Sequence, residues 1–146
     1  MSSIVITCPS CRSDNATPVQ QLLTRPRCQR CQGALSANTP SELTRETVDG
    51  VVKSSPIPVL LVLYSQWSAP STMVAPVLSE LALRHAGRLL VARINTDMNP
   101  DVMKRYNATA LPTLIMYRGG SERKRLHGVH SVVEIEQLLS DSGFSR

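Results

Sequence analysis

The chain has 146 residues, of which 42% are hydrophobic, and it carries a formal net charge of +5. This length and composition fit one small domain with a short appendage. No apolar run is long enough to cross a bilayer, and the first residues lack the basic flank and long apolar core of a signal peptide. We therefore expect no membrane partner and a reducing, cytoplasmic location.

All four cysteines lie near the start of the chain, as Cys8-Pro9-Ser10-Cys11 and, sixteen residues later, Cys28-Gln29-Arg30-Cys31. Two C-x2-C pairs at this spacing are typical of a structural Zn²⁺ site, in which four sulfurs complete a tetrahedron. We predict that Cys8, Cys11, Cys28 and Cys31 bind one structural zinc ion, and that the metal provides most of the folding free energy of this segment. Two alternatives remain open: a site that releases its zinc on oxidation, and a C-x2-C pair that acts as an independent dithiol.

The same segment is basic. Residues 1–35 have a formal charge of +3, from Arg12, Arg25, Arg27 and Arg30 against Asp14. A basic segment suggests a nucleic-acid partner. Four thiolates and one Zn²⁺ would contribute −2, however, which leaves about +1, and no aromatic residue before Tyr64 is present to stack on bases. We interpret the arginines as solvated side chains beside an anionic metal cluster and expect no nucleic-acid partner.

Residues 36–40 are short, polar and end in a proline, which predicts a linker between a zinc ribbon (1–35) and a larger domain (41–146). Apolar periodicity and turn signals predict the elements of that domain. Strands are expected at 41–44, 59–64, 89–95, 113–118 and 123–128, and helices at 46–54, after Pro70 with a kink at Pro76, at 101–106, and through Val132 to Leu139. The order β-α-β-α-β-α-β-β-α predicts an α/β fold with a mixed sheet flanked by helices.

Several motifs of this domain lie in a familiar order. They are Trp67, Pro70, Met73-Val74-Ala75-Pro76, Asn95-Thr96-Asp97-Met98-Asn99-Pro100, Ala110-Leu111-Pro112-Thr113, Gly119-Gly120 and Gly128. With these motifs, residues 41–146 resemble a thioredoxin, and with the cysteine pairs in front the chain resembles the zinc-ribbon-containing second thioredoxins of bacteria. The resemblance implies the thioredoxin fold, with a cis-proline loop at Leu111 and Pro112 and with Gly128 beside the substrate groove.

The resemblance also shows where the chain departs from the family. A thioredoxin carries Trp-Cys-Gly-Pro-Cys where this chain has Trp67-Ser68-Ala69-Pro70-Ser71. Thiol–disulfide exchange needs one thiolate to attack and a second thiol to resolve the mixed disulfide, and serine supplies neither. Val62 aligns with the family's buried aspartate, and Arg93 aligns with its usual lysine neighbour. We predict that Ser68 and Ser71, at the positions of the redox cysteines, leave the chain without dithiol activity.

Two main hypotheses about function follow. In the first, the chain is a redox-inactive module, chaperone-like or an adaptor, that binds protein or peptide clients. The groove residues implied by the resemblance are Trp67, Ala69, Pro70, Leu111, Pro112 and Gly128. In the second, it is the Cys-to-Ser form of a protein-disulfide reductase of cell redox homeostasis, with thioredoxin reductase as a partner if a cysteine-containing parent exists. Val62 favours natural loss of the chemistry, whereas paired serines are also what an experimenter would introduce.

A serine nucleophile would need a neighbouring base, and the histidines of the chain are His85, His127 and His130. Since His127 and His130 flank Gly128, a contact between Ser68 and a histidine stays open. We expect all three histidines at the surface or in turns, and we expect Ser68 to be a helix N-cap.

Overall fold

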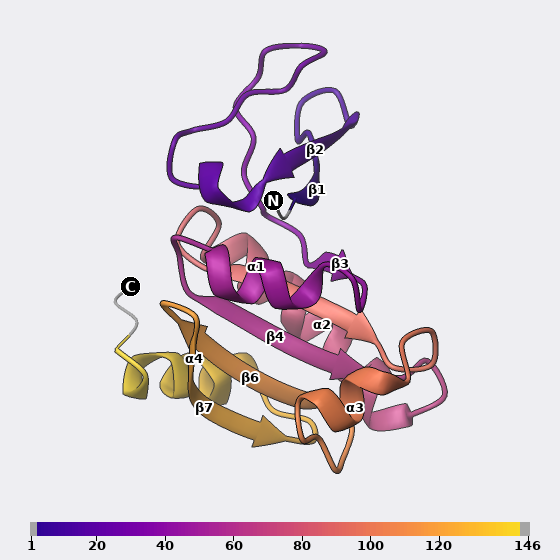
Figure 1. Ribbon diagram of the computed structural model, residues 1–146. Coiled ribbons are helices and arrows are strands. Elements are labelled where there is room, and N and C mark those ends of the chain that lie inside the picture. Colours follow the sequence, from indigo (N-terminus) through magenta and orange to yellow (C-terminus); the bar gives the residue numbers. More distant parts are fainter. Residues whose placement is uncertain (1–2, 144–146) are drawn as a thin grey trace.

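The computed structural model describes residues 3–143 and shows a small two-stranded unit packed on a larger layered unit (Figure 1). The small unit pairs strands β1 (Ser3–Thr7) and β2 (Asp14–Pro18) and continues into the 3-10 helix η1 (Val19–Gln21). The strands of the large unit are β3 (Ser41–Leu43), β4 (Val59–Tyr64), β5 (Leu90–Asn95), β6 (Thr113–Arg118) and β7 (Ser121–His127). Its helices are α1 (Val48–Ser54), α2 (Ala69–Arg84), α3 (Asp101–Arg105) and α4 (Val132–Asp141).

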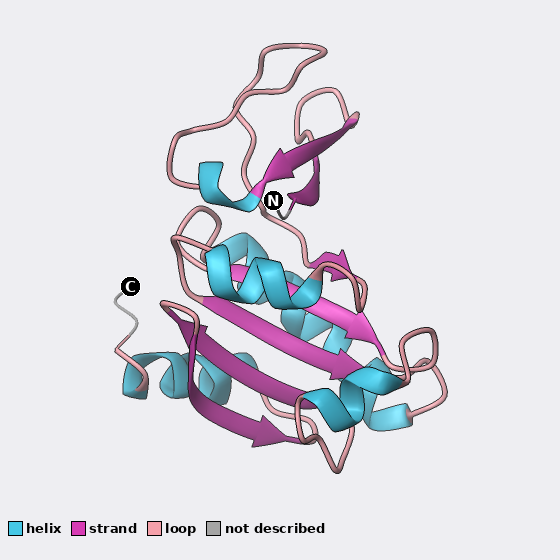
Figure 2. Cartoon of the chain, viewed as in Figure 1, coloured by secondary structure: helices cyan, strands magenta, loops and turns pink. Residues whose placement is uncertain are grey.

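The large sheet is mixed, with the strand order β3-β5-β4-β6-β7. The pairs β3–β5 and β5–β4 are parallel, whereas β4–β6 and β6–β7 are antiparallel. Helices lie on both faces of this sheet (Figure 2). The predicted α/β fold and the predicted order of elements are therefore confirmed. No helix within residues 3–143 combines the length and the apolar character needed to span a membrane.

The start of the chain and several element boundaries differ from expectation; α1, for example, begins at Val48 rather than at residue 46. The last strand begins at Ser121, directly after the glycine turn, because Ser121 pairs with Arg118 across the hairpin. Strands β1 and β2 were not predicted, because the strongest signal in the first 35 residues is the cysteine spacing. The alternation of buried Ile4 and Ile6 with exposed neighbours is the signal that indicates β1.

The central strand β4 is covered on both faces because successive residues of a strand point in opposite directions. On one face Leu60 and Val62 belong to a cluster with the buried residues of α2 and α4. On the other face Leu61 and Leu63 belong to a second cluster, which includes Val51 of α1. The uninterrupted apolar run of β4 follows from this double coverage.

The N-terminal unit shares the second cluster with the large unit. The residues before β3 that are buried in this cluster are Ile4, Ile6, Cys8, Val19, Cys28, Leu35 and Ala37. Val5, between the two isoleucines, faces the other way and is 58% exposed. Ala37 falls within the predicted linker and is buried, so this part of the linker packs into the shared apolar cluster. The division into a ribbon, a linker and a larger domain stays a prediction, and the two units share one core.

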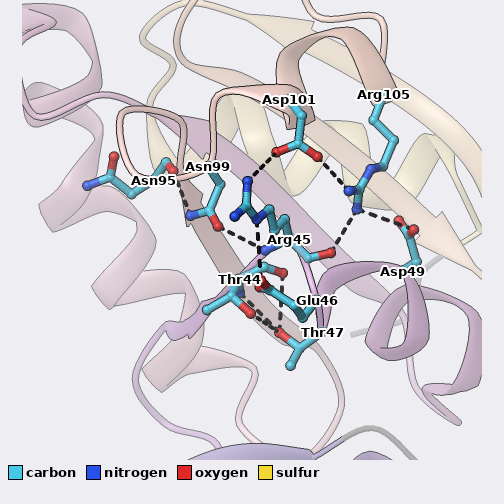
Figure 3. Close-up of polar contacts among 9 residues, drawn as sticks. All are labelled: Thr44, Arg45, Glu46, Thr47, Asp49, Asn95, Asn99, Asp101 and Arg105. Carbon is cyan, nitrogen blue, oxygen red and sulfur yellow. Dashed lines mark hydrogen bonds and ion pairs between the residues drawn. The ribbon is translucent and has the colours of Figure 1, made fainter.

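A polar network joins the start of α1 to α3 and to the loop after β5 (Figure 3). The backbone N–H of Arg45 donates to Asn99 Oδ1 at 3.0 Å, and its guanidinium lies 3.7 Å from Asp101. Arg105 pairs with Asp101 at 2.6 Å and with Asp49 at 3.3 Å. Exposed pairs of this kind contribute about 0–1 kcal/mol each. Together they position the loop that carries Asp97, which contacts the serine-containing segment.

Candidate functional site

The segment between β4 and α2 is held by hydrogen bonds to the loop after β5. Ser65 Oγ donates to both carboxylate oxygens of Asp97, each at 2.9 Å, and the backbone N–H of Gln66 donates to the same carboxylate at 3.0 Å. Ser65 Oγ also accepts the N–H of Trp67 at 3.1 Å. Ser65 and Asp97 therefore position the site, although the sequence analysis assigned them no role. The signal for Asp97 was its place in a family motif directly after a strand.

Both serine hydroxyls have structural partners. Ser68 is the N-cap of α2, and its Oγ accepts the backbone N–H of Ser71 at 3.3 Å. Ser71 Oγ accepts the backbone N–H of Ser65 at 3.2 Å, and Ser71 is only 3% exposed. Pro70 lies in the first turn of α2, where a missing N–H removes no helical hydrogen bond. The N-cap expected for Ser68 is present.

The register of the sheet brings the proline loop beside this segment. Leu63, near the end of β4, pairs with Thr113 at the start of β6, and the bond between Leu111 and Pro112 is cis. Gly128, at φ 84°, donates its N–H to the carbonyl of Pro112 at 2.8 Å. The structure thus places Leu111, Pro112 and Gly128 at the end of the sheet where β4 leads into the serine segment.

The surface at this end of the sheet is apolar and accessible. Trp67 is 86% exposed, and Ala69 and Pro70 at the start of α2 are also exposed. Within the described part of the chain, no hydrogen bond engages the backbone N–H or C=O of Leu111. An exposed aromatic side chain beside free backbone donors and acceptors suits contact with an extended polypeptide.

A small cavity of about 210 Å³ lies behind Ser71, and its lining includes Tyr64 and Arg93. Arg93 pairs with Glu42 at 2.8 Å and lies 5.1 Å from the centre of the Tyr64 ring. Burial of the phenol and its hydrogen bond to Glu42 raise the pKa of Tyr64 to about 12. Among the described residues that line the cavity there is no carboxylate, and Val62 is fully buried in the core.

The histidines are placed differently from one another. His127 Nδ1 lies 3.2 Å from Thr113 Oγ1, and His130 lies 3.3 Å from Glu134. His85 is 3% exposed, with its Nε2 2.9 Å from a carboxylate oxygen of buried Glu136, so the expectation of a surface or turn position was wrong for this residue. It is buried because α4 packs against the end of α2. Within residues 3–143, neither serine of the site is hydrogen-bonded to a histidine.

The four cysteines are brought together, as predicted. Their sulfurs all lie within 4.8 Å of one another, and both the Cys8–Cys31 and the Cys11–Cys28 sulfur pairs are 3.6 Å apart. A tetrahedral zinc site with Zn–S bonds of about 2.3 Å has S···S edges of about 3.8 Å. The donor set and its spacing therefore fit a metal ion with four thiolate ligands.

Each cysteine pair lies in the same type of turn. Cys8 donates its N–H to Ser13 O and accepts from the N–H of Arg12, while Cys28 donates to Gly33 O and accepts from the N–H of Gln32. Arg12 and Gln32 have φ values of 64° and 63°, so both turns close through a left-handed residue. The two turns are equivalent, as a site built from two C-x2-C pairs requires.

Ser13 is a residue that the sequence analysis missed. Its hydroxyl lies 3.0 Å from the Cys11 sulfur and 3.3 Å from the Cys28 sulfur. These contacts, with backbone N–H groups, lower the pKa of Cys28 to about 5 and also lower the pKa of Cys11. Although the Gly33 N–H favours the Cys31 thiolate, the neighbouring sulfurs and burial raise the pKa of Cys31 to about 11. A bound cation would favour the thiolate form of all four side chains.

The fold and the site together define a class of protein: a thioredoxin-fold domain with a helix-capped segment after the central strand, a facing cis-proline loop and an N-terminal four-cysteine cluster. The family model described as "Thioredoxin" matches residues 39–141. The chain belongs to the thioredoxin family.

Curated relatives agree with this family. Thioredoxin C-3 of Corynebacterium nephridii is 30% identical over 136 residues, which are 93% of this chain and 93% of the relative. Thioredoxin 1 of Nostoc sp. is 33% identical over 99 residues, 68% of this chain and 92% of the relative. The Bifunctional thioredoxin reductase/thioredoxin of Mycobacterium leprae is 34% identical over 108 residues, 74% of this chain and 24% of the relative. The name of the Mycobacterium leprae relative combines a thioredoxin reductase and a thioredoxin in one protein.

Proposed function

We propose that this chain is a redox-inactive thioredoxin-family module that binds extended protein or peptide clients. The observation that carries the proposal is the hydrogen bonding of the two serine hydroxyls. Ser68 caps α2, and the buried hydroxyl of Ser71 accepts a backbone N–H of the same segment. Both oxygens thus stabilise the scaffold at the positions where the family's chemistry requires sulfur.

Physical chemistry supports the loss of redox activity. A helix N-terminus favours an anion by up to about 1 kcal/mol at an exposed site, which lowers a pKa by less than about one unit. That is far too little to ionise a serine hydroxyl at neutral pH. Exchange also needs a sulfur that forms and breaks a disulfide, and oxygen offers no equivalent. The buried Val62 leaves the site without the carboxylate that assists proton transfer in the family.

The binding part of the proposal rests on what remains at this end of the sheet. Trp67 is highly exposed, and the backbone of Leu111 has its N–H and C=O available within the described structure. A client strand would pair with Leu111 and cover Trp67, with Ala69, Pro70, Pro112 and Gly128 around it. Backbone pairing gives affinity with little dependence on sequence, which suits a chaperone-like or adaptor role.

We further propose that the cysteine cluster holds one structural Zn²⁺ and that the chain is of the zinc-ribbon thioredoxin type. The alignment with Thioredoxin C-3 spans 136 of the 146 residues and so includes most of the N-terminal segment. Four thiolates close the coordination shell of zinc and leave no position for a reacting water. Reduced cysteines used as metal ligands favour a reducing compartment, the cytoplasm.

The test uses carboxymethylated insulin B chain, a labelled probe whose blocked cysteines exclude disulfide exchange. Binding is measured by the fluorescence anisotropy of the probe and, in the proteins that retain it, by the emission of Trp67, the single tryptophan of the chain. The double variant Trp67→Ala/Leu111→Ala should bind the probe about tenfold more weakly. A matched control replaces two exposed apolar side chains elsewhere, Leu83→Ala/Val133→Ala, and should leave binding unchanged. Unaltered affinity in the first variant would reject the proposed groove.

The second candidate function, a disulfide reductase present in its Cys-to-Ser form, is favoured by family membership and by the intact scaffold around the site. It predicts that Ser68→Cys/Ser71→Cys reduces insulin when driven by NADPH and thioredoxin reductase. Turnover by this variant would establish the reductase. No turnover, in a variant that folds and retains its metal, would leave the binding module as the function.

A further inference from the structure

A second concave surface lies at the opposite end of the sheet from the serines, where the N-terminal unit meets the large unit. Two cavities, of about 610 Å³ and 450 Å³, share the lining residues Leu23, Ile57 and Gly87. We call this continuous surface the junction groove. It begins before β4, whereas Ser68 follows β4, so the length of a six-residue strand, about 20 Å, separates the two sites.

The groove has an apolar base that is fixed by turns. Ile57 is buried in the base, between Pro56 and Pro58, which restrict the backbone. Leu23, which also lines both cavities and follows η1 in the chain, is a large apolar side chain that is 60% exposed. The helix η1 is anchored by fully buried Val19. An exposed leucine facing a pre-formed apolar base provides a site for an apolar side chain of a partner.

The charged side chains of the groove are all cationic. Arg25 and Arg27 line it from the N-terminal unit, and Arg88 and Arg118 line it from the large unit. No Asp or Glu is among the described residues that line it. Arg27 and Arg118 donate to the backbone carbonyls of Gln32 and Gly143, which are neutral acceptors, so neither guanidinium has an ion-pair partner among residues 3–143.

None of these four guanidinium groups forms an ion pair in the described structure, whereas Arg45, Arg84, Arg93, Arg105 and Arg125 all do. The groove thus combines apolar contact with uncompensated positive charge. This combination complements a polypeptide that carries both apolar and acidic side chains.

We propose that the junction groove binds an extended acidic segment of a partner protein. Apolar side chains of the segment would contact Leu23 and Ile57, and its carboxylates would pair with Arg25 and Arg88. A nucleic acid fits less well, because the described lining contains no aromatic side chain on which bases could stack. Since both units contribute arginines, the surface exists only while the N-terminal unit is folded and docked. It would give the protein a second contact, separate from the serine end.

The experiment measures the anisotropy of a short labelled peptide that carries glutamates and leucines in a Gly/Ser background, with the full metal-loaded chain. A counterpart with glutamines in place of the glutamates is the neutral probe. Arg25→Gln/Arg88→Gln should weaken binding of the acidic peptide by about tenfold or more. The matched control Lys104→Gln/Arg123→Gln makes the same charge change on α3 and β7, outside the groove, and should change binding by less than about twofold.

Two further variants separate the parts of the proposal. Leu23→Ser should weaken binding of both peptides, and Trp67→Ala should leave both unchanged, so failure of this site is distinguishable from failure of the serine-end groove. Equal affinity for the two peptides would overturn the proposal, and so would an equal loss of peptide affinity in Lys104→Gln/Arg123→Gln and in Arg25→Gln/Arg88→Gln. Tighter binding of a single-stranded oligonucleotide through the same arginines would also overturn it. The same holds for self-association of the chain that Arg25→Gln/Arg88→Gln abolishes.

Discussion

Replacement of Ser68 by alanine tests whether this hydroxyl is a structural group. Its Oγ accepts the N–H of Ser71 at 3.3 Å at the start of a sixteen-residue helix. Loss of an N-cap acceptor costs about 0.5–2 kcal/mol, typically about 1 kcal/mol. For a chain of this size, 1 kcal/mol corresponds to a fall in melting temperature of about 2–4 °C. Ser68→Asp should keep the stability, because aspartate is an equally good N-cap.

Ser71→Ala should cost more than Ser68→Ala. The Ser71 hydroxyl accepts the N–H of Ser65, and these two residues are 3% and 6% exposed. Without this acceptor a buried backbone donor is left unpaired, which costs about 1–3 kcal/mol. The expected order of stability is therefore wild type, Ser68→Ala, and then Ser71→Ala.

The assay is urea unfolding of the metal-loaded chain, with the free energy of unfolding taken by linear extrapolation. Ser131→Ala is the positive control, because Ser131 caps α4 in the same way and accepts the N–H of Glu134 at 3.2 Å. It should lose about 1 kcal/mol. If Ser131→Ala loses stability while Ser68→Ala stays within about 0.3 kcal/mol of wild type, the N-cap role of Ser68 is refuted.

Three further outcomes are expected. Ile6→Ala, in the core that the two units share, should lower the free energy of unfolding by about 2–5 kcal/mol in the same urea assay. Its control is Val5→Ala, on the exposed face of β1, which should change that free energy by less than about 0.5 kcal/mol. Glu136→Ala should cost about 1–3 kcal/mol in that assay, because it removes a hydrogen-bonding carboxylate beside buried His85; a loss below about 0.5 kcal/mol would contradict the buried contact. The backbone N–H of the α4 N-cap, with a smaller contribution from a histidine, lowers the pKa of Glu134. Its contribution to stability is thus complete above the unfolded pKa of about 4.3 and is lost as the pH falls through the lower folded pKa. Melting temperatures across this range should depend less on pH in Glu134→Gln, and an unchanged dependence would count against the contact.

The large unit could be predicted from sequence because its signals are local. The apolar run of β4 gave both ends of that strand correctly, and the glycine pair marked the hairpin. Strand β7 was placed two residues too late because its first four residues are all exposed and offer no apolar alternation. The cysteine cluster could be predicted for the same reason, because the two cysteines of each pair lie within one short turn.

The features that were missed depend on contacts between distant segments. His85 is buried only because α4 returns to pack against α2, and no pattern around residue 85 indicates this. The hydrogen bonds of Asp97 to Ser65 join segments 32 residues apart. Likewise Ile4 and Ile6 indicate a buried face, but the residues of the large unit that share their cluster are known only from the fold.

The shared core determines where the chain can be cut. A fragment that begins at residue 39, where the family match begins, retains every strand of the large sheet. It would also lose Ile4, Ile6, Val19 and Leu35 from the shared cluster, and the apolar surface that these side chains cover on the large unit would meet water. A contiguous apolar face of this kind promotes aggregation. Such a fragment would therefore need polar residues at the positions that the N-terminal unit covers.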